Sequence, residues 1–263
     1  MVFYEKHIRK VCSRGTPMTI HLPDNYRGKD VDQAYQAYLK KPIESNPSPA
    51  IITPSTIDNP SHYILLPSDV YCPRDLLIAK QRSHDNETWS QCQELLPKES
   101  HFMLPVRQFV DFLNLLQTDN AYDGSGAKLS RQERTDLFKD ITEQRAPYRA
   151  EWLDAQYTKQ GKIWQVTYTK VQPNGSLTKV TEPLEACLME NKTPGISLED
   201  WLQRATRQGL PSPNVKSGSL SYWSPTNNGV SRFWAVSVRV YLYCVGDPRF
   251  SSAGLGTRAA RVK

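Results

Sequence analysis

The stretch from Ser231 to Arg258 reads SRFWAVSVRVYLYCVGDPRFSSAGLGTR, and it carries a clear β pattern. Side chains between positions 238 and 245 alternate in character, and alternate side chains of a strand point to opposite faces. The face that suits an apolar core consists of Val238, Val240, Leu242 and Cys244. The opposite face consists of Arg239, Tyr241, Tyr243 and Val245. We therefore predict a strand that buries one face and presents two tyrosines on the other.

The segments upstream of this strand predict a mixed α+β domain. The most regular helical pattern follows Pro105, where Phe109, Phe112, Leu113 and Leu116 form an apolar stripe that belongs in a core. Ser130 and Glu133 have the spacing of a capping box that opens a helix to about 144. Further helices are expected at 30–39, 74–81 (a short turn), 88–96 and 198–208, and strands at 63–66, 163–171, 176–180 and 218–223.

The chain of 263 residues is long enough for one large domain or two small ones. Residues 61–263 are expected to form the α+β domain. Residues 1–60 are expected to form an irregular N-terminal extension or arm, since prolines interrupt the segment from Ile43 to His62. The first residues lack the apolar core of a secretory signal, and no apolar run is long enough to span a bilayer. The sequence therefore predicts no membrane insertion, and it leaves the protein's location open.

The composition argues against several chemical roles. The net charge of +6 is dispersed, whereas a nucleic-acid-binding protein clusters its basic residues, so we expect no nucleic-acid partner. The five cysteines include no CxxC pair, and their odd number favours free thiols. The histidines form no HxxxH or HExxH pair. We therefore predict no catalytic residue, no metal ligand and no cofactor.

The C-terminal stretch resembles the final signature of the formylglycine-generating-enzyme type of C-type lectin fold. Asp247, Pro248, Gly256 and Arg258 stand in the matching order, although Thr257 replaces the usual aromatic residue. Within that fold the chain is most similar to the variable proteins of diversity-generating retroelements. The resemblance implies a binding protein whose C-terminal region, at about 222–258, is rewritten by reverse transcription that mutates adenines and whose partner is a protein or a surface ligand.

The resemblance also implies which residues contact the ligand. The rewritten codons of that family cannot produce Trp, Met, Lys, Glu or Gln, and Trp234 is the one such residue between Gly229 and Leu255. We assign Trp234, and also Trp223, to the fixed scaffold. The predicted ligand-binding residues are Tyr222, Phe233, Tyr241, Tyr243, Val245, Gly246, Phe250, Ser252, Ala253 and Gly254.

Other interpretations of the same sequence stay open. A formylglycine-generating oxidase would use a cysteine pair, and Cys244 lies in the corresponding strand without a second cysteine nearby. A tail or receptor-binding protein of fixed specificity, from a phage or virus, would share the fold. The tyrosines would also suit an ordinary half-buried strand. The acidic loop at 119–128 resembles a calcium loop but lacks its ligand spacing.

Overall fold

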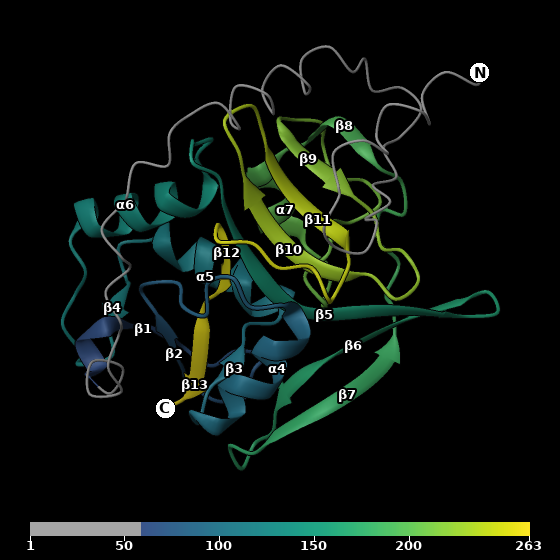
Figure 1. The fold of residues 1–263 in the computed structure, drawn as a ribbon. Helices are drawn as coiled ribbons and strands as arrows, with labels where there is room; N and C mark the ends of the chain where they lie inside the picture. Colours follow the sequence, from purple (N-terminus) through teal and green to yellow (C-terminus); the bar gives the residue numbers. More distant parts are fainter. Residues whose placement is uncertain (1–58) are drawn as a thin grey trace, which may run out of the picture. The chain divides into compact units, whose positions relative to one another are not determined.

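A computed structural model of the protein describes residues 59–263 (Figure 1). The helix expected at 30–39 and almost all of the expected N-terminal extension lie outside these residues. The described part has the mixed α+β fold that the sequence predicted, and its strands form two β-sheets. None of its helices is both long and apolar enough to cross a membrane.

The first sheet has five strands in the order β3-β13-β2-β1-β4, and all its pairings are antiparallel. In Figure 1, β13 at the end of the chain lies between strands from much earlier in the sequence. The strands are β1 (Tyr63–Leu66), β2 (Leu76–Ala79), β3 (Phe102–Met103), β4 (Tyr122–Asp123) and β13 (Ala259–Val262).

The helical turn expected at 74–81 is wrong, because this segment forms strand β2. Leu76, Leu77 and Ile78 are all buried, and β2 is a central strand that pairs with β1 on one side and β13 on the other. A short apolar run suits a strand that is buried on both faces but is ambiguous in a local pattern. The deciding partner, β13, comes from the far end of the chain.

The second sheet has eight strands in the order β7-β6-β5-β10-β11-β9-β8, with β12 paired in parallel to β5 beside this path. The predicted hairpin around Asn174 and Gly175 is confirmed as β6 and β7, and Gly175 adopts a φ of +85° in its turn. The strands are β5 (Arg149–Gln160), β6 (Ile163–Val171), β7 (Leu177–Pro183), β8 (Lys192–Ile196), β9 (Leu220–Trp223), β10 (Val230–Ala235), β11 (Val240–Gly246) and β12 (Leu255–Thr257).

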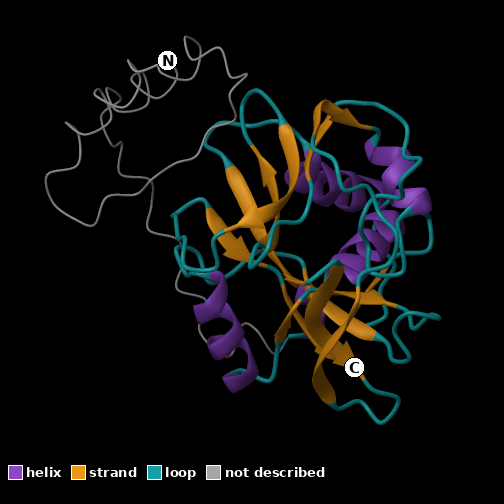
Figure 2. Ribbon diagram, turned by 90° about the vertical axis from the view of Figure 1, so that its right-hand side faces the viewer, coloured by secondary structure: helices purple, strands orange, loops and turns teal. Residues whose placement is uncertain are grey.

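Helices lie on both sides of the strands (Figure 2). Two begin with complete capping boxes, at Thr88 and at Ser130, and the second of these was predicted. The last helix ends at Arg204, before the predicted end at 208, because the backbone already becomes extended at Ala205, with φ of −61° and ψ of 147°. The helices are the 3-10 helix η1 (Pro60–His62), α4 (Trp89–Lys98), α5 (Val106–Leu116), α6 (Arg131–Thr142) and α7 (Leu198–Arg204).

Helix α5 joins the two sheets. It contacts β1 of the first sheet and β5 of the second, and it also packs against α6 and α7. The stripe of Phe109, Phe112, Leu113 and Leu116 is buried in the main hydrophobic cluster, as predicted. This single cluster contains residues of both sheets, which therefore share one core.

A buried ion-pair cluster makes a second connection between the sheets. Arg258, which is 1% exposed, donates hydrogen bonds to the carbonyl oxygens of Ala79 and Lys80 beside β2. It also pairs with Glu151 of β5 at 2.7 Å, and Arg149 contacts the same carboxylate. Burial alone would raise the pKa of Glu151, but the two arginines outweigh it and hold the pKa at about 2. Arg258, the final residue of the C-terminal signature, therefore has a structural role in linking the two sheets.

Candidate functional site

Strand β11 has the two-faced pattern that the sequence predicted. Val240, Leu242 and Cys244 are buried, whereas Tyr241, Tyr243 and Val245 are half-buried on the other face. Val238 differs from the prediction, because it lies in the turn between β10 and β11 and is 65% exposed. The aromatic side of β11 is therefore an outer surface of the second sheet.

Six side chains gather on this surface, and we call them the aromatic face. The register of the strand pairing places most of them side by side. On the antiparallel pair β10 and β11, Trp234 lies opposite Tyr241 and Arg232 opposite Tyr243. Tyr243 also lies beside Trp223 of the parallel strand β9. All six side chains are half-buried. The aromatic face consists of Trp223, Arg232, Trp234, Tyr241, Tyr243 and Phe250.

Ring contacts hold the aromatic face together. The ring centroids of Trp234 and Tyr241 are 5.3 Å apart, and those of Trp234 and Tyr243 are 6.2 Å apart at near right angles. Trp223 lies 5.8 Å from Tyr243. Tyr148 packs edge-on against Trp234 at the border of the face. Ring pairs in tilted and edge-to-face arrangements of this kind stabilise one another beyond their buried area.

Arg232 lies at the centre of the aromatic face. Its guanidinium carbon is 4.5 Å from the ring centroid of Tyr243, 4.8 Å from Trp234 and 5.1 Å from Phe250. Trp152 lies on the inner side at 5.7 Å. Burial lowers the pKa of Arg232, although its tyrosine neighbours act in the opposite direction. Among the described residues no carboxylate forms an ion pair with this arginine.

The aromatic face also holds buried donors without acceptors. Within residues 59–263, the indole Nε1 atoms of Trp223 and Trp234 and the Nε atom of Arg232 are buried and lack a hydrogen-bond partner. By contrast, the indoles of Trp89 and Trp201 donate to backbone carbonyl oxygens. Unpartnered donors are costly in a folded protein, so three of them in one cluster mark an unusual surface.

Three of the predicted ligand-binding residues lie in the interior, and their assignment is corrected. Tyr222 is fully buried and its hydroxyl donates to the carbonyl oxygen of Leu188. Phe233 packs between Phe109 and Trp201. Gly246 is buried, and a Cβ atom there would lie 2.9 Å from the carbonyl oxygen of Val230. Each of them lies on the core face of its strand, opposite the neighbours that reach the surface.

The remaining predicted residues lie on or beside the aromatic face. Tyr241, Tyr243 and Val245 come from β11, and Phe250 follows in the loop after Asp247. In the same loop Ala253 is exposed, whereas the Ser252 and Tyr148 hydroxyl groups form a hydrogen bond. Gly254 packs so closely on Tyr148 that a Cβ atom would lie 2.6 Å from its ring. Ser252 and Gly254 are thus held by the scaffold.

Sequence reasoning missed the role of β10. Trp234 and Trp223 were assigned to scaffold, and Arg232 was not considered. The alternation that was read along β11 also applies to β10, where Arg232 and Trp234 flank the buried Phe233. This period of two, applied to both strands, would have found the central arginine.

Cys244 lies beneath the aromatic face. It is fully buried, and its thiol accepts a hydrogen bond from the hydroxyl of Ser231. Burial raises the pKa of Cys244 to about 11, so little thiolate forms at neutral pH. Within residues 59–263, no cluster of His, Cys, Asp or Glu is suited to holding a metal ion. In the acidic loop, the Asp123 carboxylate caps the backbone of its own turn.

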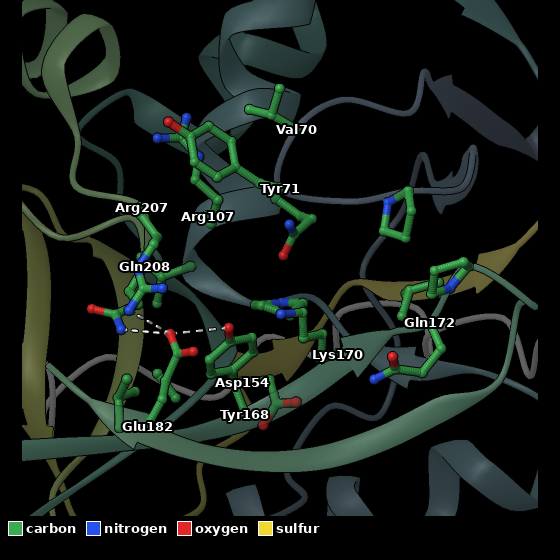
Figure 3. Close-up of a pocket in the computed structure, with 18 residues that line it drawn as sticks. Val70, Tyr71, Arg107, Asp154, Tyr168, Lys170, Gln172, Glu182, Arg207 and Gln208 are labelled. Atoms are coloured by element: carbon green, nitrogen blue, oxygen red, sulfur yellow. Dashed lines mark hydrogen bonds and ion pairs between the residues drawn. The ribbon is translucent and has the colours of Figure 1, made fainter. Parts of the chain in front are cut away.

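A separate cleft of about 420 Å³ lies between the start of α5 and strand β6 (Figure 3). Figure 3 shows Gln208 and Tyr168 converging on Glu182, at 2.6 Å and 3.3 Å from its carboxylate. The buried Asp154 at the cleft accepts hydrogen bonds from Gln93 and Lys179. Both carboxylates are therefore satisfied by the chain itself. The cleft contains none of the predicted ligand-binding residues.

The fold and the site define a mixed α+β protein with an aromatic surface on its C-terminal strands. No family model, no curated protein and no solved structure matches the chain. The C-type lectin fold and the resemblance to retroelement variable proteins therefore stay predictions.

Proposed function

We propose that the protein is a ligand-binding protein whose C-terminal aromatic face contacts a protein or cell-surface partner. We further propose that this face belongs to a lectin-like fold and is diversified by reverse transcription directed at adenines. The observation that supports binding most directly is the aromatic face itself, because residues from three neighbouring strands and the following loop gather there and are all partly exposed. Within that surface the ligand-contacting residues are expected to be Tyr241, Tyr243, Val245, Phe250 and Ala253.

The alternation of β11 explains how such a surface could vary. Substitutions at Tyr241 and Tyr243 would alter the outer face only, because the core contacts of the strand come from Leu242 and Cys244. Tyrosine and tryptophan give a large rigid contact area at low entropic cost and are common anchors in interfaces. A stable protein partner would cover about 800 Å² on this side. The aromatic face with the loop at 247–254 would form the centre of that area.

The DNA around the gene tests the proposal of diversification. We expect a near-copy of the segment that encodes residues 230–258, with differences confined to adenines, beside a gene for a reverse transcriptase. Differences should fall on codons for the outward residues Tyr241, Tyr243 and Val245 and spare those for Leu242 and Cys244. A missing copy, or one that differs at other bases, contradicts diversification.

A binding protein of fixed specificity is the second candidate. The mutual contacts within the aromatic face favour fixed specificity, because Arg232 contacts the rings of Tyr243, Trp234 and Phe250 at the same time. Changing one ring alters the surroundings of the cation, which limits free variation. Both candidates use the same surface, and the DNA copy separates them.

A further inference from the structure

We propose that the aromatic face recognises a carboxylate on a protein partner, with Arg232 as its counter-charge. This inference rests on the proposed use of the face as the binding surface, and it adds the chemistry of the partner. The site is Arg232 with the rings and indole donors of Trp223, Trp234 and Tyr243 around it. The partner group is an aspartate or glutamate side chain that reaches Arg232 from the solvent side.

The charge balance of the buried arginines is the first argument. Arg149 and Arg258 both contact Glu151, and Arg107 is paired with Asp111. For Arg232 the described residues provide aromatic rings and the hydroxyl group of Tyr243, but no carboxylate. A cation that is removed from water needs a compensating charge more than an exposed one does. The fold supplies that charge to these three arginines and also to the buried Arg134, which pairs with Asp119, and leaves it to the partner at Arg232.

The unpartnered donors are the second argument, and it is independent of the charge. The Nε atom of Arg232 and the indole nitrogens of Trp223 and Trp234 can only donate hydrogen bonds. A ligand that satisfies them must therefore present acceptors. Small rotamer changes at an interface are common when a partner binds, and they would turn these donors toward the incoming oxygen atoms. A carboxylate offers two acceptor oxygens, which match the forked geometry of a guanidinium.

The surroundings favour a protein carboxylate over a phosphate or a nucleic acid. The next basic residue in the loop, Arg249, is already paired with Asp247 through two contacts of 3.1 Å. The aromatic face itself contains one cation, Arg232, which matches a single negative charge, whereas a nucleic acid requires several cations along its backbone. The rings around Arg232 suit the apolar atoms that surround an acidic side chain in a protein interface.

Indole signals in the spectrum of the full ¹⁵N-labelled chain provide the test. The protein has six tryptophans, whose Nε1–H signals are assigned with Trp→Phe variants. The probe is the blocked peptide acetyl-Gly-Glu-Gly-amide, and the matched peptide carries Gln in place of Glu. The Glu peptide should shift the signals of Trp223 and Trp234, with a dissociation constant on the order of 1–10 mM, and leave Trp89 and Trp201 in place. The Gln peptide should bind about tenfold more weakly.

Two variants with equal loss of charge provide the control. Arg232→Gln should weaken binding of the Glu peptide by about tenfold or more. Arg261 lies over the ring of Tyr63 in the first sheet, so Arg261→Gln should not change binding. An unshifted Trp201 signal reports that each variant is folded. If Arg232→Gln fails to fold, Arg232→Lys keeps the charge, loses the fork and should bind more weakly than the natural chain.

Four results would overturn carboxylate recognition. The first two are the absence of any shift with the Glu peptide and equal shifts with the Glu and Gln peptides. The other two are equal binding by the Arg232 and Arg261 variants, and shifts of Trp223 and Trp234 by inorganic phosphate alone. The DNA copy is an independent observation. If the DNA copy is missing but the Glu peptide binds, diversification is excluded and carboxylate recognition stands. If the copy is present but the Glu peptide does not bind, carboxylate recognition is excluded and diversification stands.

Discussion

Phe233 and Trp234 are neighbours in the chain but have opposite environments. Phe233 is 1% exposed and packs between Phe109 and Trp201, whereas Trp234 belongs to the aromatic face. The same division separates Leu242 from Tyr241 on the paired strand. Residue type alone does not make this division, because aromatic side chains occur on both faces. The period of two along each strand makes it.

Truncation of one aromatic residue on each face should separate core from surface. Phe233→Ala should lower the free energy of unfolding by about 3–5 kcal/mol, because it leaves a cavity in the core. Tyr241→Ala should lower it by about 1 kcal/mol, since its side chain is only half-buried. Urea unfolding of the two variants measures both values. Similar losses would mean that Tyr241 is a core residue and that the aromatic face is not a surface.

The ion-pair cluster at Glu151 should make the free energy of unfolding depend on pH in the acidic range. Its pKa is lowered from 4.5 to about 2, so the stabilisation is complete above about pH 4.5 and disappears as the pH falls through about 2. Glu151→Gln leaves Arg149 and Arg258 with a neutral neighbour and should cost about 3–5 kcal/mol at pH 7. The difference in unfolding free energy between the natural chain and the variant should shrink between pH 4.5 and pH 2. A constant difference would contradict the role of this charge.

At the scale of elements, local patterns predicted those elements whose partners are close in sequence. The α5 stripe, the capping box at Ser130 and the hairpin turn at Asn174 each carry their own signal, and all three are confirmed. Strand β2 was misread because one of its partners is β13. Strand β5 was largely overlooked, since it buries Glu151 and Asp154. Arg149 on the same strand pairs with Glu151, but both acids also depend on distant partners, Arg258 and Lys179, that no local pattern shows.

The candidate site was predicted to a similar extent. The sequence identified β11 and the loop that carries Phe250, and both contribute to the aromatic face. It wrongly included Tyr222 and Phe233, because an aromatic residue was taken as an anchor without a check of its strand face. It omitted Arg232, whose uncompensated charge becomes visible only when the neighbours across the sheet are known.

The helix caps give a prediction at the element scale. The Ser130 hydroxyl accepts a hydrogen bond from the Glu133 amide, so Ser130→Ala should lower the unfolding free energy by about 1 kcal/mol. Thr135→Ala, within the same helix α6, removes no cap and should change it by less than about 0.5 kcal/mol. Thermal unfolding followed by circular dichroism compares the two. A larger loss for Thr135→Ala would show that the cap does not limit this helix.

At the scale of the whole described region, the two sheets should unfold as one unit. Helix α5 packs on strands of both, and Arg258 binds carbonyl oxygens beside β2 together with Glu151 of β5. Separating the sheets would expose α5 and leave the buried Arg258 and Glu151 without each other. Because the shared core and the buried ion pair would be lost in the same step, an intermediate with one intact sheet is disfavoured.

The buried cysteines can report this cooperativity. Cys72 lies in the first-sheet side of the core, whereas Cys187 and Cys244 lie with the second sheet, and all three are free and buried. Burial raises the pKa of Cys187 to about 12 and that of Cys244 to about 11, so the folded protein should react slowly with a thiol reagent. In a Cys12→Ser background, pulses of reagent across a urea series should label Cys72 and Cys244 with the same midpoint. Phe112→Ala, in α5, should lower both midpoints together, because Phe112 belongs to the core that the sheets share and also lies against Arg258. Labelling of Cys72 at a lower urea concentration than Cys244 would show that the first sheet unfolds alone and that neither α5 nor the ion pair couples the two.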